Sequence, residues 1–401
     1  MMKPLEGGIV VGKPLIRIHM EAQIIYAQKI SFQEENKLSP QIMKNCFHAA
    51  IEINNILTAE NKRVAYFFID PLLHSFEAAN RFYFGILGCN TIRKINTYKT
   101  GVGPIQAMTD AGELIKNDLY DAIFIFGHEP LLSDTRNYGR DTIKKAMEIF
   151  EDFSLIQCYD LLARQLCRET DISNDEFREL ADRLFNNYSR TFRNKSGTLL
   201  DSPRGKTLRD LGTDLFCLTD CANPNIDFAG GFIVANNRTA EQLKIPKDRR
   251  IKVSGSKYSI VKGSPKAIYS ITGKHNDLFS HLKDAFLRAQ AESQIDIIQE
   301  FQNKNLLLEA YTCYPPIPIA LLLATGFVNN INEIGDFLKH HEITVTGGMN
   351  IARAPWNNPA LNGLIEVTEL LVKGNSQYGM VHGNGGIGEA QGITVLERPY
   401  G

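Results

Sequence analysis

The chain has 401 residues, of which 43% are hydrophobic and 22% charged, and its formal net charge is -1. This length exceeds one ordinary core, so we expect one large α/β domain or two domains. The near-zero charge gives no general attraction to nucleic acid or anionic membrane. No apolar run reaches the roughly 18–20 residues that a membrane span requires.

The N-terminus has no long apolar segment followed by a small-residue cleavage site, so we expect no signal peptide. Seven scattered cysteines do not form a disulfide framework. Cys217 and Cys221 are four residues apart, but no second Cys/His pair at zinc-ligand spacing accompanies them. We therefore expect a protein of the reducing cytoplasm, without a metal site.

Buried-type runs alternate with helical patterns along the first half. Predicted strands are Ile9–Val11 with Leu15–Ile18, Val64–Ile69, Ile92–Tyr98, Ala122–Phe126 and Phe228–Ala235. Predicted helices are Ser39–Leu57, within a long helix-like region after the first strand, and Ile105–Ile115. From about 142 to 212 the chain is charged and helix-like, which indicates an excursion between core strands.

The second half repeats this alternation. Predicted strands are Ile251–Val253, Ala267–Ile271, Leu306–Ala310, Ile343–Thr346, a strand ending at His382, and Ile393–Leu396. Predicted helices are Leu278–Gln290, one that begins near Pro318, and one that Asn358 caps with Pro359 at its first position. Alternating buried strands and helices are typical of α/β layers.

Two distant segments share one layout. Residues 100–131 and 356–388 each contain a proline turn, an amphipathic helix, a Lys-Asn or Lys-Gly-Asn break, and a strand that ends at a His beside Gly. This echo indicates a duplicated α/β half, with chance similarity of two such units as the alternative. Function in these folds gathers at strand ends and helix N-termini. The candidate places are Thr100–Pro104, Tyr311–Pro315, Thr346–Asn358 and His382–Gly388.

Together these places resemble the thiolase superfamily, most closely its sterol-carrier-protein-type and archaeal acetoacetyl-CoA branch. The similarity is strongest at Leu308–Pro315, Thr344–Asn358 and Tyr378–Leu396. It implies a five-layer α-β-α-β-α fold built from two duplicated halves, at 1–240 and 246–401. It also implies that the excursion at about 142–212 is a helical loop subdomain, inserted in the first half, that contacts coenzyme A.

The resemblance also implies that the usual catalytic residues are replaced. Thiolases use a Cys nucleophile, which a His activates, and oxyanion holes that stabilise the thioester oxygen. Gly101 stands where the nucleophile is expected, and Ala354 stands where the Gly-His-Pro motif has its His. Tyr311 and Thr312 replace the polar pair that precedes Cys-Phe, whereas Cys313 and Tyr314 match that motif. His382 matches the His before the final glycine-rich turn.

By this resemblance the catalytic candidates are Cys313, His382 and Tyr311. Each has a structural alternative: a packed thiol, a histidine bonded to backbone, and a core aromatic. The candidates for substrate and oxyanion contacts are Gly101, Gly347, Gly348, Asn384, Gly385 and Gly386. We expect His128-Glu129 to be structural. The basic run 189–210 is a candidate for coenzyme A phosphates or simply a solvated loop.

The functional expectation is an acyltransferase of the acetyl-CoA acetyltransferase type, with Claisen chemistry on acyl-CoA thioesters and an altered catalytic set. The alternative is a non-catalytic acyl-CoA-binding or assembly protein on the same scaffold. The resemblance implies a homodimer or dimer of dimers, with a protein partner in an acyl-CoA-processing complex. No cofactor is expected beyond coenzyme A as substrate or ligand.

Overall fold

The computed structural model describes residues 20–34, 37–92, 94–148, 153–197, 205, 208–262, 268–275 and 277–399. The strands predicted at Ile9–Val11 and Leu15–Ile18 lie outside these residues. Within the described part, no helix is both long and apolar enough to cross a membrane.

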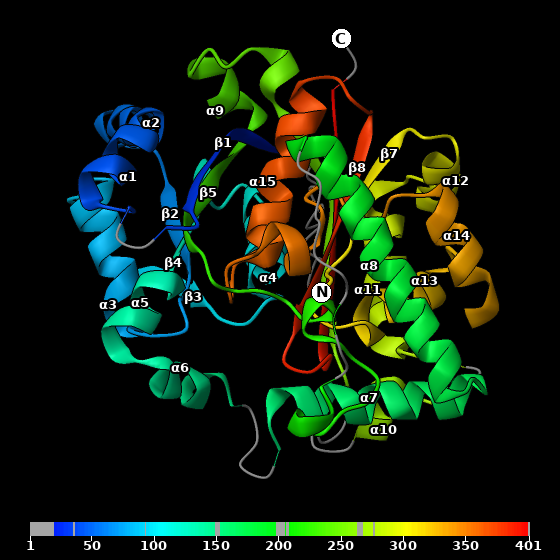
Figure 1. The fold of residues 1–401 in the computed structure, drawn as a ribbon. Coiled ribbons are helices and arrows are strands. Elements are labelled where there is room, and N and C mark those ends of the chain that lie inside the picture. Colours follow the sequence, from blue (N-terminus) through cyan, green and yellow to red (C-terminus); the bar gives the residue numbers. More distant parts are fainter. Residues whose placement is uncertain are drawn as a thin grey trace, which may run out of the picture.

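The described strands form one mixed sheet of nine strands (Figure 1). Its order is β3-β2-β4-β5-β1-β6-β9-β8-β7. The strands are β1 (Ala22–Phe32), β2 (Val64–Ile69), β3 (Ile95–Tyr98), β4 (Ala122–Pro130), β5 (Asp227–Asn236), β6 (Ile251–Ile260), β7 (Leu306–Glu309), β8 (Tyr378–Gly385) and β9 (Ala390–Glu397).

The sheet consists of two sets of strands that repeat one topology. Gln23 and Ile24 of β1 pair with Lys252 and Ile251 of β6, and this short contact joins the sets. The first set has the order β3-β2-β4-β5-β1, and the second has β7-β8-β9-β6, the same order without its outermost strand. Parallel pairs β2–β4 and β7–β8 occupy matching places. The repetition explains the echo between the two distant sequence segments.

The second set has no described strand in the place that β3 has in the first. The sequence predicts a strand at Ile343–Thr346, and that prediction is wrong. The segment is extended beside β7, and the Ala310 N–H donates to the Ile343 carbonyl at 2.9 Å. The Glu309 carboxylate then accepts the N–H groups of Val345 and Thr346 at 2.7 and 3.0 Å. A side chain therefore takes the bonds that a strand ladder would have used.

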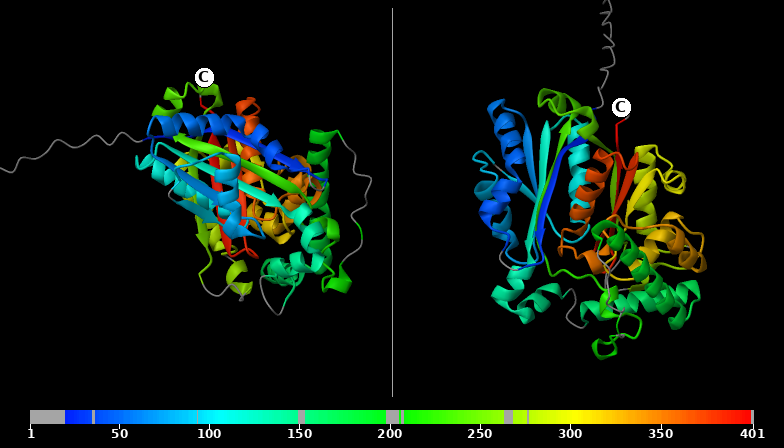
Figure 2. Two further views of the ribbon diagram at one scale, coloured as in Figure 1. Left: turned by 90° about the vertical axis from the view of Figure 1, so that its left-hand side faces the viewer. Right: turned by 45° about the horizontal axis from the view of Figure 1, so that its top comes forward.

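Helices cover both faces of each strand set and give α-β-α-β-α layers (Figure 2). The central layer contains α4 (Gly103–Lys116) and α15 (Pro359–Val372), whose apolar faces share one buried core with both sets. Outside the first set lie α1 (Pro40–Cys46), α2 (His48–Ala59), α3 (Ser75–Asn80) and the π-helix η1 (Arg81–Ile86). Outside the second lie α11 (Ser280–Ser293), α12 (Ile297–Gln302), α13 (Pro316–Thr325) and α14 (Ile334–His340).

Three further local predictions differ from the structure. The single helix at Ser39–Leu57 is two helices, with a break at Phe47, which is fully buried. β1 lies in a region that the sequence pattern assigned to helix, because its pairing with β5 is a long-range contact. The strand predicted at Ala267–Ile271 is the helix α10 (Ile268–Thr272), and Ala267 lies outside the described residues. Ile271 is buried in the core against α7, so packing decides its conformation.

The predicted excursion is helical and lies between β4 and β5. The helical segment begins earlier than the predicted position 142, with α5 (Leu131–Tyr138) and α6 (Arg140–Met147), and it continues through α7 (Leu155–Thr170) and α8 (Asn174–Ser196). Ser154 with Gln157 and Ser173 with Glu176 form capping boxes that start the two long helices. The remaining elements are α9 (Asn237–Gln242) and the short helices η2 (Arg209–Leu211), η3 (Leu218–Asp220), η4 (Lys247–Arg249), η5 (Ile331–Glu333) and η6 (Gly348–Ala352).

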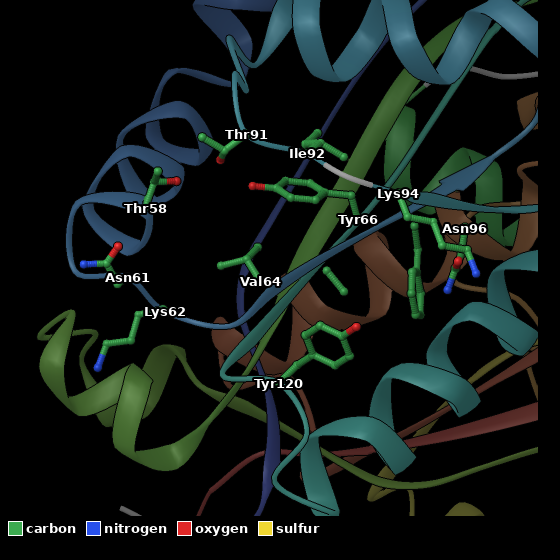
Figure 3. A pocket seen from close by; sticks show the side chains of 12 residues that line it. Thr58, Asn61, Lys62, Val64, Tyr66, Thr91, Ile92, Lys94, Asn96 and Tyr120 are labelled. Carbon is green, nitrogen blue, oxygen red and sulfur yellow. The ribbon is translucent and has the colours of Figure 1, made fainter.

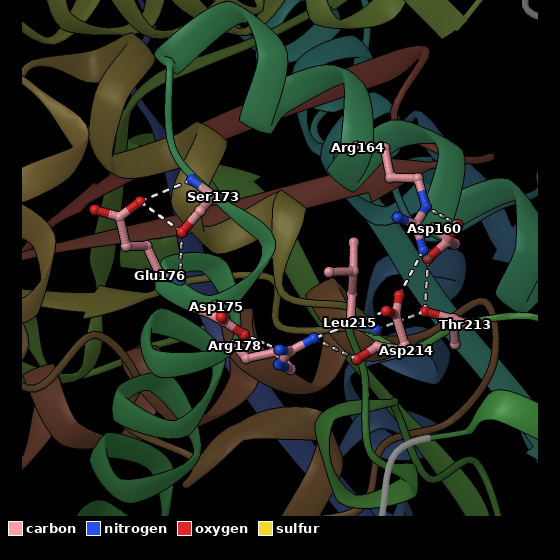
Figure 4. A network of polar contacts seen from close by, with 9 residues as sticks. All are labelled: Asp160, Arg164, Ser173, Asp175, Glu176, Arg178, Thr213, Asp214 and Leu215. Atoms are coloured by element: carbon pink, nitrogen blue, oxygen red, sulfur yellow. Dashed lines mark hydrogen bonds and ion pairs between the residues drawn. The ribbon is translucent and has the colours of Figure 1, made fainter.

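A polar network joins the segment between α8 and β5, at Thr213 and Asp214, to α7 and α8 (Figure 4). Thr213 Oγ1 donates to Asp160 Oδ1 at 2.6 Å, and Arg164 Nη2 donates to Asp214 Oδ1 at 2.6 Å. Arg164 Nε also donates to Asp160 Oδ2 at 2.7 Å, so one guanidinium holds two carboxylates. The network fixes α7, which contributes Leu155 and Tyr159 to the pocket described next.

Candidate functional site

The site lies where α4 begins against the end of β8. Gly383 on β8 faces Ile105 of α4, and a Cβ atom on Gly383 would lie 2.7 Å from Ile105 Cγ1. The glycine therefore lets the helix N-terminus approach the strand closely. In the other half, Gly127 on β4 meets Asn358, the residue before α15, in the same way. Each half thus supports the first turn of the other half's central helix.

A pocket of about 270 Å³ opens at this place. Its walls come from the loop before α4, the start of α7, the segment after β7, the loop before α15, and the turn between β8 and β9. The lining residues are Leu72, Lys99, Thr100, Gly101, Ala146, Met147, Glu148, Leu155, Tyr159, Ala222, Pro224, Tyr311, Cys313, Tyr314, Met349, Ala354, Pro355, Trp356, Asn357, Asn384, Gly386 and Glu389. The structure therefore brings together residues from all four places that the sequence singled out.

The Tyr311 hydroxyl fills the space beside Gly101. A Cβ atom on Gly101 would clash with Tyr311 Oη and would lie 2.5 Å from the Asn384 carbonyl oxygen. A cysteine at position 101 therefore has no room in this arrangement. Thr100, the preceding residue, has a positive φ of 75°, which is unusual for a β-branched residue and marks strain at this turn.

His382 begins a chain of buried hydrogen bonds. The Tyr311 N–H donates to His382 Nδ1 at 3.4 Å, so the imidazole proton is on Nε2, which donates to Gln391 Oε1 at 2.7 Å. Gln391 Nε2 then donates to Asn384 Oδ1 at 2.6 Å and to the Gly388 carbonyl at 2.9 Å. Both nitrogens of His382 are occupied, and the ring does not line the pocket.

The chain continues into the pocket wall through Asn384. Its Nδ2 group donates to Tyr159 Oη at 3.3 Å and to Cys313 Sγ at 3.8 Å. The Cys313 thiol points to Tyr159 Oη at 3.5 Å, and the Tyr159 hydroxyl donates to the Gly386 carbonyl at 2.9 Å. Donors and acceptors alternate without conflict, so the network fixes the orientation of the Asn384 amide and the Tyr159 phenol.

Burial controls the charge state of these groups. It lowers the pKa of His382 to about 4, so the imidazole is neutral at pH 7. It raises the pKa of the Cys313 thiol to about 12, so the nucleophilic thiolate is scarce. The pKa of Tyr311 is raised well above its usual range, also by burial, and its hydroxyl remains a proton donor.

The structure places the other predicted site residues as follows. Gly386 lines the pocket, and Ala354 lies in its wall at the position expected for a histidine. Gly385 packs on Thr100 and Val102 at the start of α4. Gly347 and Gly348 have positive φ and face Phe192 and Tyr188 of α8, outside the pocket lining.

The sequence pattern did not single out Tyr159, Gln391 or Glu389. Tyr159 stacks on Tyr314 with ring centroids 4.0 Å apart and so closes one side of the pocket. Gln391 and Glu389 come just after the final glycine-rich turn. That turn is the sequence feature by which His382 was singled out, so it could also have indicated these two residues. Tyr159 comes from an inserted helix, and only tertiary contacts bring it to the site.

His128 and Glu129 lie at the end of β4. Glu129 is fully buried, and it accepts the N–H of Leu72 at 3.0 Å and the N–H of Asn357 at 3.3 Å. Burial raises the pKa of Glu129 to about 8 and lowers that of His128 to about 4. Glu129 therefore fastens the loop before α15, which agrees with the structural role expected for it.

The described part of the basic run 189–210 contacts the second half of the chain. Arg190 donates to the Leu338 carbonyl at 3.0 Å, and Lys195 pairs with Glu366 at 2.6 Å. Residues 198–204 and 206–207 of this run lie outside the described residues. No group of three or more His, Cys, Asp or Glu side chains suited to a metal occurs among the described residues.

A second pocket, of about 500 Å³, lies at the start of β2 and β3 (Figure 3). Thr58, Lys62, Tyr66 and Lys94 are among its lining residues. This pocket is larger than the candidate site, but it lies at the N-terminal ends of β2 and β3. The candidate site lies beyond the C-terminal end of β3. Ligands of α/β folds bind beyond the carboxyl ends of strands, so we assign the function to the smaller pocket.

Comparison with known proteins gives similarity in structure alone. No family model matches the sequence, and no curated protein matches it. A monomeric SCP2-thiolase-like protein type 1 from Mycobacterium smegmatis is 16% identical with a TM-score of 0.70, covering 95% of this chain and 78% of that one. An Ltp2–ChsH2(DUF35) aldolase is 13% identical with a TM-score of 0.66, covering 94% and 98%.

Human mitochondrial 3-ketoacyl-CoA thiolase is 12% identical with a TM-score of 0.63, covering 95% of this chain and 99% of the human chain. At these identities the similarity concerns the fold. The chain therefore has the thiolase fold, as the sequence resemblance predicted.

Proposed function

We propose that this chain, with its thiolase fold, binds an acyl-CoA thioester and forms or breaks a carbon–carbon bond on it without an acyl-enzyme. The observation that carries the proposal is the position of the Tyr311 hydroxyl. It occupies the space that a side chain at position 101 would fill, at the N-terminus of α4.

Covalent acyl transfer has little support from the geometry. Gly101 has no nucleophilic atom, and Cys313 is 6% exposed with a pKa of about 12. A thiol in this state is a poor nucleophile at neutral pH, because the thiolate is the reacting form. The acyltransferase expected by resemblance therefore needs a different mechanism here.

Enolate chemistry fits the same groups better. The Tyr311 hydroxyl is held protonated by burial, and a helix N-terminus favours negative charge. The hydroxyl and the helix N-terminus both suit the carbonyl oxygen of a thioester, which becomes an oxyanion when a bond to the Cα of the thioester breaks. In this mechanism the Tyr311 O–H donates to that oxygen, and the ordered Asn384 shapes the adjoining wall. Coenzyme A is then part of the substrate, and no resident cofactor or metal takes part.

The test uses acetyl-CoA with the purified protein. We expect binding by calorimetry, no acetyl adduct by intact mass spectrometry, and at least ~10-fold loss of any carbon–carbon activity in Tyr311→Phe, because an oxyanion donor is removed. Cys313→Ala is the matched control and should bind equally well. An acetyl adduct that forms on the wild type and disappears in Cys313→Ala would replace this proposal with covalent acyl transfer.

A non-catalytic acyl-CoA-binding or assembly protein is the second candidate. Its support is that His382 is fully engaged in structural hydrogen bonds and that Ala354 replaces a histidine. Acetyl-CoA binding without exchange or cleavage of any tested thioester would favour it.

We propose a cytoplasmic homodimer, or dimer of dimers, that works with a protein partner. The partner is suggested by the Ltp2–ChsH2(DUF35) neighbour, whereas another neighbour is described as monomeric. Light scattering after size-exclusion chromatography decides the subunit number, and a monomer mass would contradict the dimer.

A further inference from the structure

Glu389 is a carboxylate in the pocket that the proposed reaction does not yet use. It lies in the turn between β8 and β9, and its side chain lines the same pocket as Tyr311 and Asn384. The backbone on either side is fixed, because the Val261 N–H donates to the Glu389 carbonyl at 2.7 Å and Ala390 pairs with Ile260. The backbone of Glu389 therefore has a defined position in the wall of this pocket.

Its own turn holds the carboxylate in place. Glu389 Oε2 accepts the Ile387 N–H at 2.7 Å, and the carboxylate lies against Gly386, where an added Cβ atom would clash with it. Gly386 has a positive φ of 63°, so the turn itself also needs this glycine. The side chain is thus preorganised without a bond from the rest of the pocket.

Among the described residues, no Lys, Arg or His side chain forms an ion pair with Glu389. The other carboxylate of the pocket lining, Glu148, is exposed, whereas Glu389 is half-buried. Partial burial raises the pKa of Glu389, which makes its carboxylate a stronger base than a solvated one.

We propose that Glu389 is the general base that removes a proton from Cα of the bound thioester. The substrate class is then a thioester with an enolisable Cα. The carboxylate oxygen binds the proton, the C–H electron pair becomes the enolate C=C bond, and the carbonyl π electrons move to the oxygen, which accepts from Tyr311 O–H. Return of the proton from Glu389 regenerates the thioester. This inference rests on the proposed function.

Deuterium exchange tests this step without knowledge of the second substrate. The full-length protein is incubated with acetyl-CoA in D₂O, and deuterium in the acetyl group is followed by mass spectrometry. We expect exchange with the wild type and a ~100-fold slower rate with Glu389→Gln, the scale of general-base catalysis. Gln keeps an acceptor for the Ile387 N–H, so the turn and the acetyl-CoA Kd should be preserved. Glu179→Gln, at an exposed position of α8 outside the pocket lining, is the control and should exchange within about twofold of the wild type.

The pH profile gives a second readout that a structural role would not change. The wild-type exchange rate should rise with pH through the raised pKa of Glu389, because the base acts when deprotonated, and Glu389→Gln should lack this inflection. The titratable groups that share the pocket or couple to Glu389 are Lys99, Glu148, Cys158, Tyr159, Tyr311, Cys313 and Tyr314. If Glu389→Gln does not fold, Glu389→Asp serves instead, with a rate at least ~10-fold below the wild type because the carboxylate is withdrawn.

The outcomes separate this inference from the function on which it rests. Exchange by Glu389→Gln at the wild-type rate, with loss in Tyr311→Phe, would overturn the base assignment and keep the proposed function. A wild-type protein that binds acetyl-CoA but shows no exchange would overturn both. Absence of acetyl-CoA binding would remove the pocket assignment as well.

Discussion

At the scale of single residues, Gly101 and Tyr311 share the space that one side chain would otherwise fill. A phenol that reaches into a glycine's empty position presents its hydroxyl at the helix N-terminus. The same hydroxyl excludes a thiol from that position by contact. A side chain at position 101 and the Tyr311 hydroxyl therefore exclude each other in this arrangement.

Gly101→Ala should destabilise the protein by ~1–3 kcal/mol, the cost of overpacking a tight core, since its Cβ clashes with Tyr311 Oη. Urea unfolding measures the effect. Tyr311→Phe in the same chain should recover part of the loss, so a double-mutant cycle should show coupling of at least ~0.5 kcal/mol. Full recovery is not expected, because the Asn384 carbonyl also lies 2.5 Å from the added atom. Wild-type stability of Gly101→Ala would contradict the contact.

His382 should make stability depend on pH. Its pKa is lowered from 6.5 to about 4 in the folded protein, so its contribution is complete above pH 6.5 and is lost as pH falls towards 4. We expect His382→Gln to lose less stability than the wild type between pH 7 and 4, by ~2–4 kcal/mol. Chemical unfolding at several pH values measures this difference. His128 also has a pKa of about 4 and remains in both proteins, so parallel curves would show that His382 does not titrate there.

At the scale of elements, the helical excursion is built into the core rather than attached to it. Phe177, Leu184 and Tyr188 of α8 and Leu162 of α7 belong to the core that covers the second strand set. The segment that returns from the excursion is fixed by Thr213, which donates to Asp160 of α7 and accepts the Leu215 N–H at 3.0 Å. This arrangement positions Tyr159 in the pocket wall.

Thr213→Val should cost ~1–3 kcal/mol, because it removes one hydrogen bond to the buried Asp160 carboxylate and leaves the Leu215 N–H without its partner while volume is kept. Thr213 is 2% exposed, so water cannot replace the hydroxyl. Thermal unfolding followed by circular dichroism measures the loss. Thr58→Val, on the exposed end of α2, is the control and should stay within ~0.5 kcal/mol of the wild type. Equal melting of both variants would show that the network carries no stability.

At the scale of the whole molecule, the two halves meet through their central helices. Gly127 and Gly383 admit the helix start of the opposite half, and Gly392 of β9 also faces Ile105, with an added Cβ atom 2.7 Å from its Cγ2 atom. The candidate site lies at one of these two crossings and therefore depends on how the halves dock.

Gly383→Ala and Gly112→Ala should have opposite effects. At 383 the added methyl lies 2.7 Å from Ile105 Cγ1, so we expect a loss of ~1–3 kcal/mol and weaker acetyl-CoA binding. At 112, within α4, nothing lies within 4 Å, and the better helix propensity of Ala should add ~0.5–1 kcal/mol. Urea unfolding of both variants checks this. Equal stability changes would contradict the close approach of β8 to α4.

Sequence pattern was sufficient for the continuous buried strands and for the segments that meet at the candidate pocket. Val64–Ile69 is a strand with the predicted bounds, because its apolar run is buried between helix layers. The segments at Gly101, Tyr311 and His382 also meet as expected. Pattern failed where a distant partner decides the structure: β1 pairs with β5, and Glu309 takes the N–H groups that would have made a strand at Ile343–Thr346.

The sequence by itself indicated the layered α/β fold and the duplication, which depend on residue type and spacing along the chain. Its resemblance to thiolases implied that Gly101 and Ala354 stand where a nucleophile and a histidine are expected. Only the tertiary structure decided that both ring nitrogens of His382 are engaged in hydrogen bonds, that burial raises the pKa of the Cys313 thiol, and that Tyr311 and Glu389 line one pocket. The charge state of a side chain and its position relative to the pocket depend on burial and on neighbours from distant segments. Spacing along the chain does not specify either of these.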